Sequence, residues 1–173
     1  MDKSFKGIKI TFWIFFSLSI ILNAFIIFQS CLPASSSMLW SNVFVDMVNN
    51  ISHSTGGGNV REIAGIGISD FIRKSIGHFS LFLADGVITY LMFYFLTKFK
   101  AINLKNFTII PTLLLGIFVA SISEFIQYFI PTRAGLIADV GIDVLGYIVG
   151  AGITFAITLI VDHHHKKKLA LSE

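Results

Sequence analysis

The chain has 173 residues, of which 54% are hydrophobic and only 13% are charged, and its mean hydropathy is +0.79. An ordinary soluble domain has about 25% charged residues, so this composition excludes such a domain and indicates a membrane protein. The formal net charge of +3 does not indicate nucleic-acid binding, because the basic residues flank apolar stretches and do not cover one face of a folded module.

Four apolar stretches dominate the chain. The hydrocarbon core of a bilayer is about 30 Å thick and needs roughly 20 apolar residues per spanning helix. Four stretches meet this requirement, at about residues 10–28, 76–96, 107–130 and 136–161. They leave no room for a separate soluble domain. We therefore predict an all-α, polytopic integral membrane protein: a bundle of four transmembrane helices that forms a single domain over residues 1–173.

The first stretch follows Lys3, Lys6 and Lys9, an arrangement that is also typical of a cleaved signal peptide. The apolar run is long for a signal peptide, and the proline of Leu32-Pro33-Ala34 makes a poor cleavage site. We therefore favour an uncleaved signal-anchor over a cleaved leader.

The long loop over residues 30–74 contains apolar residues at helical spacing. These are Trp40, Val43, Phe44, Met47, Val48 and Ile51. They predict a short amphipathic helix in this first external loop, which lies in the membrane interface or caps the bundle.

Lysines and arginines near the spans predict the orientation, because they are enriched in cytoplasmic loops. With the N-terminus inside, the cytoplasmic flanks hold Lys3, Lys6, Lys9, Lys98, Lys100, Lys105 and Lys166–Lys168. The outer side then holds Arg61, Arg73, Lys74 and Arg133. We expect a multi-pass protein of the cell membrane with both termini in the cytoplasm.

This orientation brings polar residues of three spans to one depth at the outer rim. They are Lys74, His78, Glu124, Gln127, Arg133, Asp139 and Asp143. Ionisable groups are costly within a membrane, so they are candidates for function. They could instead form ion pairs that only hold the bundle together, but buried ion pairs stabilise weakly compared with apolar packing. In the last span, Gly146-x-x-x-Gly150 predicts a close helix contact.

Several motifs, in order, resemble the pattern of VanZ-like membrane proteins. They are F-I-R-K-S-I-G-H-F over residues 71–79, Ser123-Glu124-x-x-Gln127, Arg133, and Asp139-x-x-x-Asp143-x-x-Gly146. The family usually has Asn where Asp143 stands, and Glu where Ser80 stands. The family is similar to a protein that confers low-level resistance to the glycopeptide teicoplanin. The resemblance marks Lys74, His78, Glu124, Gln127, Arg133 and Asp139 as site residues.

The first functional hypothesis is a resistance-associated envelope protein whose rim pocket binds the headgroup of a membrane lipid or of a lipid-linked cell-wall precursor. In this hypothesis Arg73, Lys74 and Arg133 bind a phosphate or carboxylate of the headgroup. Hydroxyl, amine or amide groups of the headgroup donate hydrogen bonds to side chains of the pocket. These acceptors are Glu124, Gln127 and Asp139.

The second hypothesis is an enzyme on a lipid-linked or peptidoglycan substrate, with His78 as general acid or base, oriented by Glu124 or Asp139. No activated nucleophile is evident. We expect no cofactor; a metal site of His78, Glu124 and Asp139 is a less favoured alternative, because it has one histidine. A small transporter or channel subunit is a further alternative, suggested by Asp85 deeper in the second span.

Asp139 and Asp143 stand one helical turn apart, so ionising both would place like charges side by side. A protonated Asp143 offers one donor and acceptor capacity, as Asn does. We hypothesise that Asp143 acts as a neutral hydrogen-bonding group and that Asp139 carries the charge.

Overall fold

The computed structural model describes most of the chain. The described residues are 3–33, 46, 50, 51, 53, 54, 56, 60–100, 108–131, 133 and 135–171. Of residues 3, 4, 60–76 and 169 only the backbone is described.

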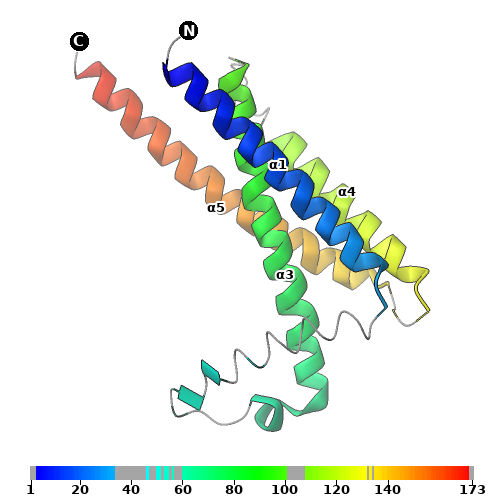
Figure 1. The fold of residues 1–173 in the computed structure, drawn as a ribbon. Coiled ribbons are helices and arrows are strands. Elements are labelled where there is room, and N and C mark those ends of the chain that lie inside the picture. Colours follow the sequence, from blue (N-terminus) through cyan, green and yellow to red (C-terminus); the bar gives the residue numbers. More distant parts are fainter. Residues whose placement is uncertain are drawn as a thin grey trace.

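Four long helices make up the described structure (Figure 1). They are α1 (Lys3–Cys31), α3 (Val60–Phe99), α4 (Ile109–Tyr128) and α5 (Ile137–Ala170). Each contains a stretch that is long and apolar enough to cross a membrane: Phe5–Cys31, Gly77–Phe99, Ile109–Tyr128 and Ile137–Lys168. In the described residues there is no strand. The predicted all-α architecture with four apolar spans is therefore confirmed.

Two helices run further than the apolar stretches that predicted them. α3 begins at Val60, well before the predicted span, so the loop that was expected to reach residue 74 is shorter. α5 continues to Ala170 through the histidine- and lysine-rich tail, whose lysines are good helix formers. Hydropathy locates the part of a helix that lies in lipid, not the ends of the helix. The predicted amphipathic helix over residues 40–51 lies largely outside the described residues.

α3 and α5 cross in close contact, and glycines make the contact possible. A Cβ atom at Gly146 would collide with the carbonyl oxygen of Phe79, and one at Gly150 with that of Leu83. From the opposite side, a Cβ atom at Gly86 would collide with the carbonyl oxygen of Tyr147. The predicted contact at the Gly146-x-x-x-Gly150 motif is thus confirmed, and its partner is α3.

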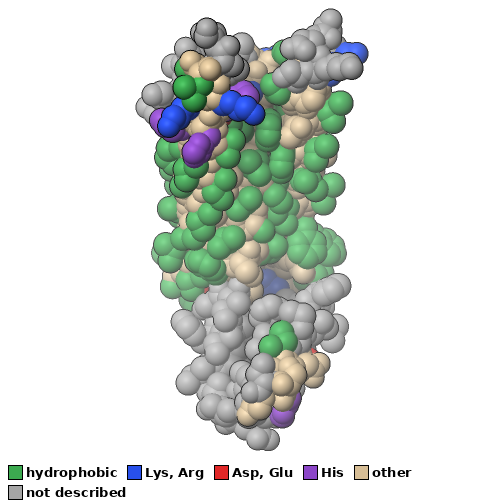
Figure 2. Space-filling model, turned by 90° about the vertical axis from the view of Figure 1, so that its left-hand side faces the viewer, with side chains coloured by type: hydrophobic (Ala, Val, Ile, Leu, Met, Phe, Trp, Pro, Cys, Tyr) green, Lys and Arg blue, Asp and Glu red, His purple; other side chains and the backbone are tan. Residues whose placement is uncertain are grey.

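The surface and the interior follow the logic of a protein in lipid. Large apolar side chains are exposed along the helices and form a wide band between the two ends of the molecule (Figure 2). The core is small and contains residues of all four helices. It is formed by Ile26, Phe82, Val119, Ala120 and Tyr147. Many other buried side chains are polar, so hydrogen bonds inside the bundle accompany the apolar packing.

The two ends of the bundle differ. Both termini lie at one end, as an even number of spans requires, and the turn between α4 and α5 lies at the other (Figure 1). Near the termini, Asp162 of α5 accepts hydrogen bonds from Lys98 and Tyr94 of α3, each over 2.7 Å. Exposed basic side chains of the α5 tail lie at this same end (Figure 2).

The glycine contact predicts a stability difference between two neighbouring glycines of α5. Gly150→Ala should lower the stability of the bundle by about 1–3 kcal/mol, because the methyl group meets the backbone of Leu83. Gly152→Ala is the matched control, because a Cβ atom there meets nothing within 4 Å. Thermal unfolding of the purified variants, followed by size-exclusion chromatography, measures the difference. Equal midpoints for the two variants would contradict the backbone contact.

Candidate functional site

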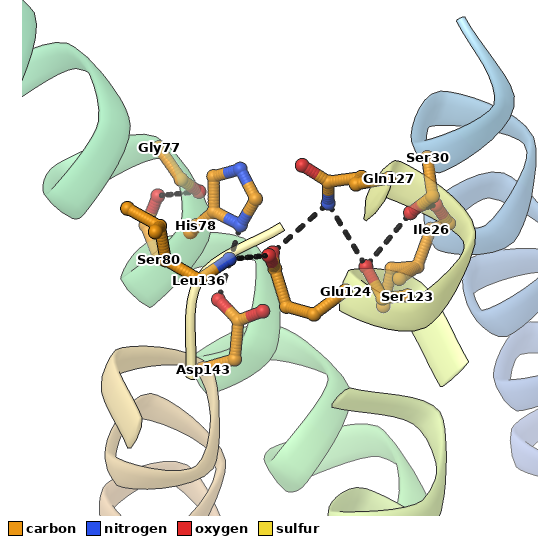
Figure 3. Close-up of polar contacts among 10 residues, drawn as sticks. All are labelled: Ile26, Ser30, Gly77, His78, Ser80, Ser123, Glu124, Gln127, Leu136 and Asp143. Carbon is orange, nitrogen blue, oxygen red and sulfur yellow. Dashed lines mark hydrogen bonds and ion pairs between the residues drawn. The ribbon is translucent and has the colours of Figure 1, made fainter. Parts of the chain in front are cut away.

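The site is built around a hydrogen bond between α3 and α5. Nδ1 of His78 lies 3.1 Å from Oδ1 of Asp143 (Figure 3). Asp143 is fully buried, whereas the side chain of His78 is 27% exposed. The glycine contact explains this pairing. Gly146 brings α5 onto the backbone of Phe79, the neighbour of His78, and Asp143 stands just before Gly146 on the same helix.

Glu124 comes from the end of α4, and its two carboxylate oxygens are held separately. Nε2 of Gln127 donates to Oε1 over 3.0 Å, and the backbone N–H of Leu136 donates to Oε2 over 3.2 Å. The second bond requires the turn after α4 to fold back on the helix. Gly135 permits this, because a Cβ atom there would lie 2.5 Å from the carbonyl oxygen of Glu124. The carboxylate is therefore fixed in position before any ligand arrives.

A chain of hydrogen bonds connects Glu124 to α1. Nε2 of Gln127 also lies 3.4 Å from Oγ of Ser123, which is 2.7 Å from Oγ of Ser30. Ser30 donates its proton to the carbonyl oxygen of Ile26 over 2.9 Å. Each hydroxyl has a single proton, so Ser123 donates to Ser30 and accepts from Gln127. The chain thus has one direction, which fixes the amide of Gln127 with its NH₂ group toward Glu124.

Asp139 adds a further carboxylate at this place. It lies in the first turn of α5 and is buried. Its charge acts on both His78 and Glu124. We call His78, Glu124, Gln127, Asp139 and Asp143 the rim cluster. It places one imidazole and three carboxyl groups from three helices at the end of the bundle opposite the termini.

Arg133 lies on the turn between α4 and α5 and is partly buried. Burial lowers the pKa of its guanidinium, while the negative charge of Glu124 acts in the opposite direction. An arginine remains protonated under these conditions. In the part of the chain that the structure describes, its guanidinium makes no hydrogen bond or ion pair. It therefore offers a cationic fork next to the rim cluster.

Three members of the rim cluster have a spacing suitable for a metal ion. His78, Glu124 and Asp143 can each offer one ligand atom, and these atoms lie within 4.8 Å of one another. One imidazole nitrogen and two carboxylate oxygens suit a divalent transition metal, which would polarise a bound water or carbonyl group. The sequence suggested Asp139 as the third ligand of this alternative, but the structure places Asp143 there.

The structure gathers most of the residues that the sequence singled out. His78, Glu124, Gln127, Asp139 and Asp143 lie together, although the hydrogen-bonding partner of His78 is Asp143 and not Glu124 or Asp139. Arg133 lies beside them, and among the described residues no hydrogen bond or ion pair joins its guanidinium to them. Arg73 and Lys74 belong to α3, but their side chains lie outside the described residues. The roles of all these residues remain predictions.

The groups that hold Glu124 in place do not stand out in the sequence. Ser30, Gly135 and the N–H group of Leu136 belong to no motif with a chemical role. The sequence does show a serine at the end of an apolar span and a glycine just before the next one. These residues indicate close packing only when the partner helix is known.

The sequence profile of the VanZ/LLP1 family matches residues 13–159, a range that contains all four spans in whole or in part and the whole rim cluster. The chain belongs to the VanZ/LLP1 family. No curated protein and no solved structure matches the chain. The resemblance that the motifs indicated is confirmed. Two observations indicate a multi-pass membrane protein: membership in the VanZ/LLP1 family, and four helices that are long and apolar enough to cross a membrane.

Proposed function

We propose that this VanZ/LLP1 protein binds the polar headgroup of a lipid or of a lipid-linked cell-wall precursor in a pocket formed by the rim cluster and Arg133. The observation that supports the proposal best is the convergence of His78, Glu124 and Asp143. They come from α3, α4 and α5, yet their ligand atoms lie within 4.8 Å of one another. Folding would not gather costly polar groups at one membrane depth merely for stability, because apolar packing stabilises more cheaply.

The chemistry of these side chains suits a headgroup that carries both an anion and hydrogen-bond donors. Arg133 can bind a phosphate or carboxylate through two parallel N–H groups. Carboxylates of the rim cluster can accept hydrogen bonds from hydroxyl, amide or amine groups. Arg73 and Lys74, which precede His78 on α3, add positive charge on the same stretch of helix. A lipid-linked precursor carries all of these groups, and so do some anionic phospholipids.

The proposal places the pocket at the outer face of the cell membrane. Both termini and the α3–α4 connection are flanked by lysines, whereas the opposite end has few basic residues, which favours cytoplasmic termini. A pocket at the outer leaflet is where a cell-wall precursor becomes accessible to glycopeptides. The motif resemblance to a teicoplanin-resistance protein supports a role in reduced susceptibility to glycopeptides of this type.

A second candidate function, enzymatic turnover of the same headgroup, is favoured by the geometry of His78. Its Nδ1 is bonded to the buried Asp143, and the other ring nitrogen faces away from that carboxyl group (Figure 3). A carboxylate on one ring nitrogen fixes the tautomer and orientation of an imidazole that acts through the other nitrogen. His78 can therefore serve as general acid or base, with Asp143 as its positioning residue.

The Arg133→Lys variant tests the anion contact. Lysine keeps the charge but loses the planar fork, so affinity for the headgroup should fall about tenfold or more, which corresponds to about 1.4 kcal/mol. Binding of a fluorescent lipid-linked cell-wall precursor to purified protein in nanodiscs measures this, with phosphatidylglycerol as the competing anionic lipid. Lys98→Arg, at the opposite end of the bundle, is the control and should bind normally. Unchanged affinity in Arg133→Lys would leave Arg133 with a point-charge or structural role only.

Cysteine labelling in whole cells tests the orientation. The only native cysteine is removed by Cys31→Ser. A membrane-impermeant maleimide should then react with Ser54→Cys in the first loop, and with Asn103→Cys only after the cells are lysed. Gly56 is the less suitable labelling position, because its φ of 80° is strained for any residue with a side chain. Labelling of position 103 alone in intact cells would place the rim cluster on the cytoplasmic side.

Substitutions of the three carboxyl groups separate binding from turnover. For a binding pocket, Asp143→Asn should preserve affinity, because Asn still accepts from the N–H group of His78, whereas Glu124→Gln and Asp139→Asn should abolish it. For an enzyme, wild-type protein should release product from the precursor, detectable by mass spectrometry. Asp143→Asn should then lower the rate by about tenfold or more while binding persists. No product from wild-type protein rejects the second candidate, and loss of binding in Asp143→Asn contradicts the neutral role of Asp143.

A further inference from the structure

A second polar cluster lies inside the bundle, away from the rim cluster. Its centre is Asp85 of α3, which is fully buried. Oδ1 of Asp85 accepts hydrogen bonds from Nδ2 of Asn23 over 3.0 Å and from Oγ1 of Thr89 over 3.3 Å. Asn23 and Ser19 belong to α1, and Oγ of Ser19 lies 3.1 Å from Oγ1 of Thr89. Asp85 follows His78 by seven positions, which puts this cluster about 10 Å further along α3.

The third helix of this cluster is α5, which contributes Tyr147. This residue is buried, and its ring packs where Gly116 of α4 leaves room. Its hydroxyl lies near Thr89 and Asp85 but outside the geometry of a hydrogen bond. We call Ser19, Asn23, Asp85, Thr89 and Tyr147 the Asp85 cluster. It offers one carboxylate, one amide carbonyl and three hydroxyl oxygens.

Three polar atoms of the Asp85 cluster are buried without a hydrogen-bond partner in the described chain. They are Oδ1 of Asn23, Oδ2 of Asp85 and the phenolic oxygen of Tyr147. The first two are acceptors, so a positively charged or proton-donating species is what would satisfy them. Buried polar atoms without a partner are rare in proteins and are more costly still within a membrane.

The surroundings of the Asp85 carboxyl group also favour a positively charged species at this place. Among the described residues, no ion pair involves Asp85, and no basic side chain acts on its carboxyl group. A carboxylate at this depth without a counter-charge is expensive. Oδ1 already receives two hydrogen bonds, whereas Oδ2 receives none from the described residues, so Oδ2 is the oxygen that a bound cation would satisfy.

We propose that the Asp85 cluster binds one small monovalent cation, sodium, between α1, α3 and α5. Oxygen donors of this kind suit hard cations. The cluster supplies a single carboxylate, so a monovalent ion leaves it neutral, whereas a divalent ion would leave one uncompensated charge in low-dielectric surroundings. The cluster shares no residue with the rim cluster, so the sodium site goes beyond the proposed headgroup binding.

The test is equilibrium binding of radioactive sodium to the full-length protein in nanodiscs, with N-methylglucamine keeping the ionic strength constant. Wild-type protein should bind sodium saturably, with one ion per chain. Asp85→Asn, which keeps the shape of the side chain and removes its charge, should weaken binding by about tenfold or more. Asp162→Asn is the matched control at the lysine-rich end of α5, and Glu124→Gln is the control for the rim cluster; both should bind as wild type does.

Two further measurements keep the proposal open to failure even if Asp85→Asn is unstable. Tyr147→Phe removes only the unpartnered hydroxyl and should weaken sodium binding several-fold without changing chromatographic behaviour. In wild-type protein at saturating sodium, the infrared carbonyl band of protonated Asp85, identified as the band that Asp85→Asn removes, should be absent. A persistent band that Asp85→Asn removes would mean that Asp85 is simply protonated. No saturable sodium binding by wild-type protein, or equal binding by Asp85→Asn, would also overturn the site and leave water as the occupant.

Discussion

The close contact of α3 and α5 is the constraint on which the rest of the structure depends. Because Gly146 and Gly150 have no side chain, the backbone of α5 reaches the carbonyl groups of Phe79 and Leu83. That approach sets the register of the two helices. It places Asp143 against His78 at one level and Tyr147 near Asp85 at a deeper one. A helix contact made by small residues thus determines the position of both polar clusters.

Hydrogen bonds then fix the side chains that the helices bring together. In lipid there is no water to satisfy a misplaced polar group, so most polar groups must find hydrogen-bond partners inside the bundle. The hydrogen-bond chain from Gln127 through Ser123 to Ser30 provides such partners between α4 and α1. Between α4 and α5, the turn folds back at Gly135, and the N–H group of Leu136 donates to Glu124. Such preorganisation would lower the cost of binding the proposed headgroup, because little side-chain entropy would remain to be lost.

Much of this arrangement could be predicted from the sequence, since hydropathy and charge act locally. Hydropathy and charge were enough to predict four apolar spans and the gathering of His78, Glu124 and Asp143 at one depth. The hydrogen-bonding partner of His78 could not be predicted, because spacing along a helix gives the face of a residue but not the rotation of one helix against another. Likewise, Asp85 stood out as a charge in an apolar span, but Ser19, Asn23 and Tyr147 around it could be assigned only once the helix contacts were known. The start of α3 at Val60 could not be predicted from hydropathy, because the helix continues beyond its apolar stretch.

The measurement that most directly tests the central claim is a structure of the protein in nanodiscs, determined by electron cryomicroscopy with a lipid-linked cell-wall precursor bound. We expect density for the headgroup between α3, α4 and α5. Its anionic group should lie within hydrogen-bonding distance of Arg133, and its polar groups should contact the carboxyl groups of the rim cluster. Precursor density that lies only along the apolar outer faces of the helices, with no contact to His78, Glu124 or Arg133, would contradict the account.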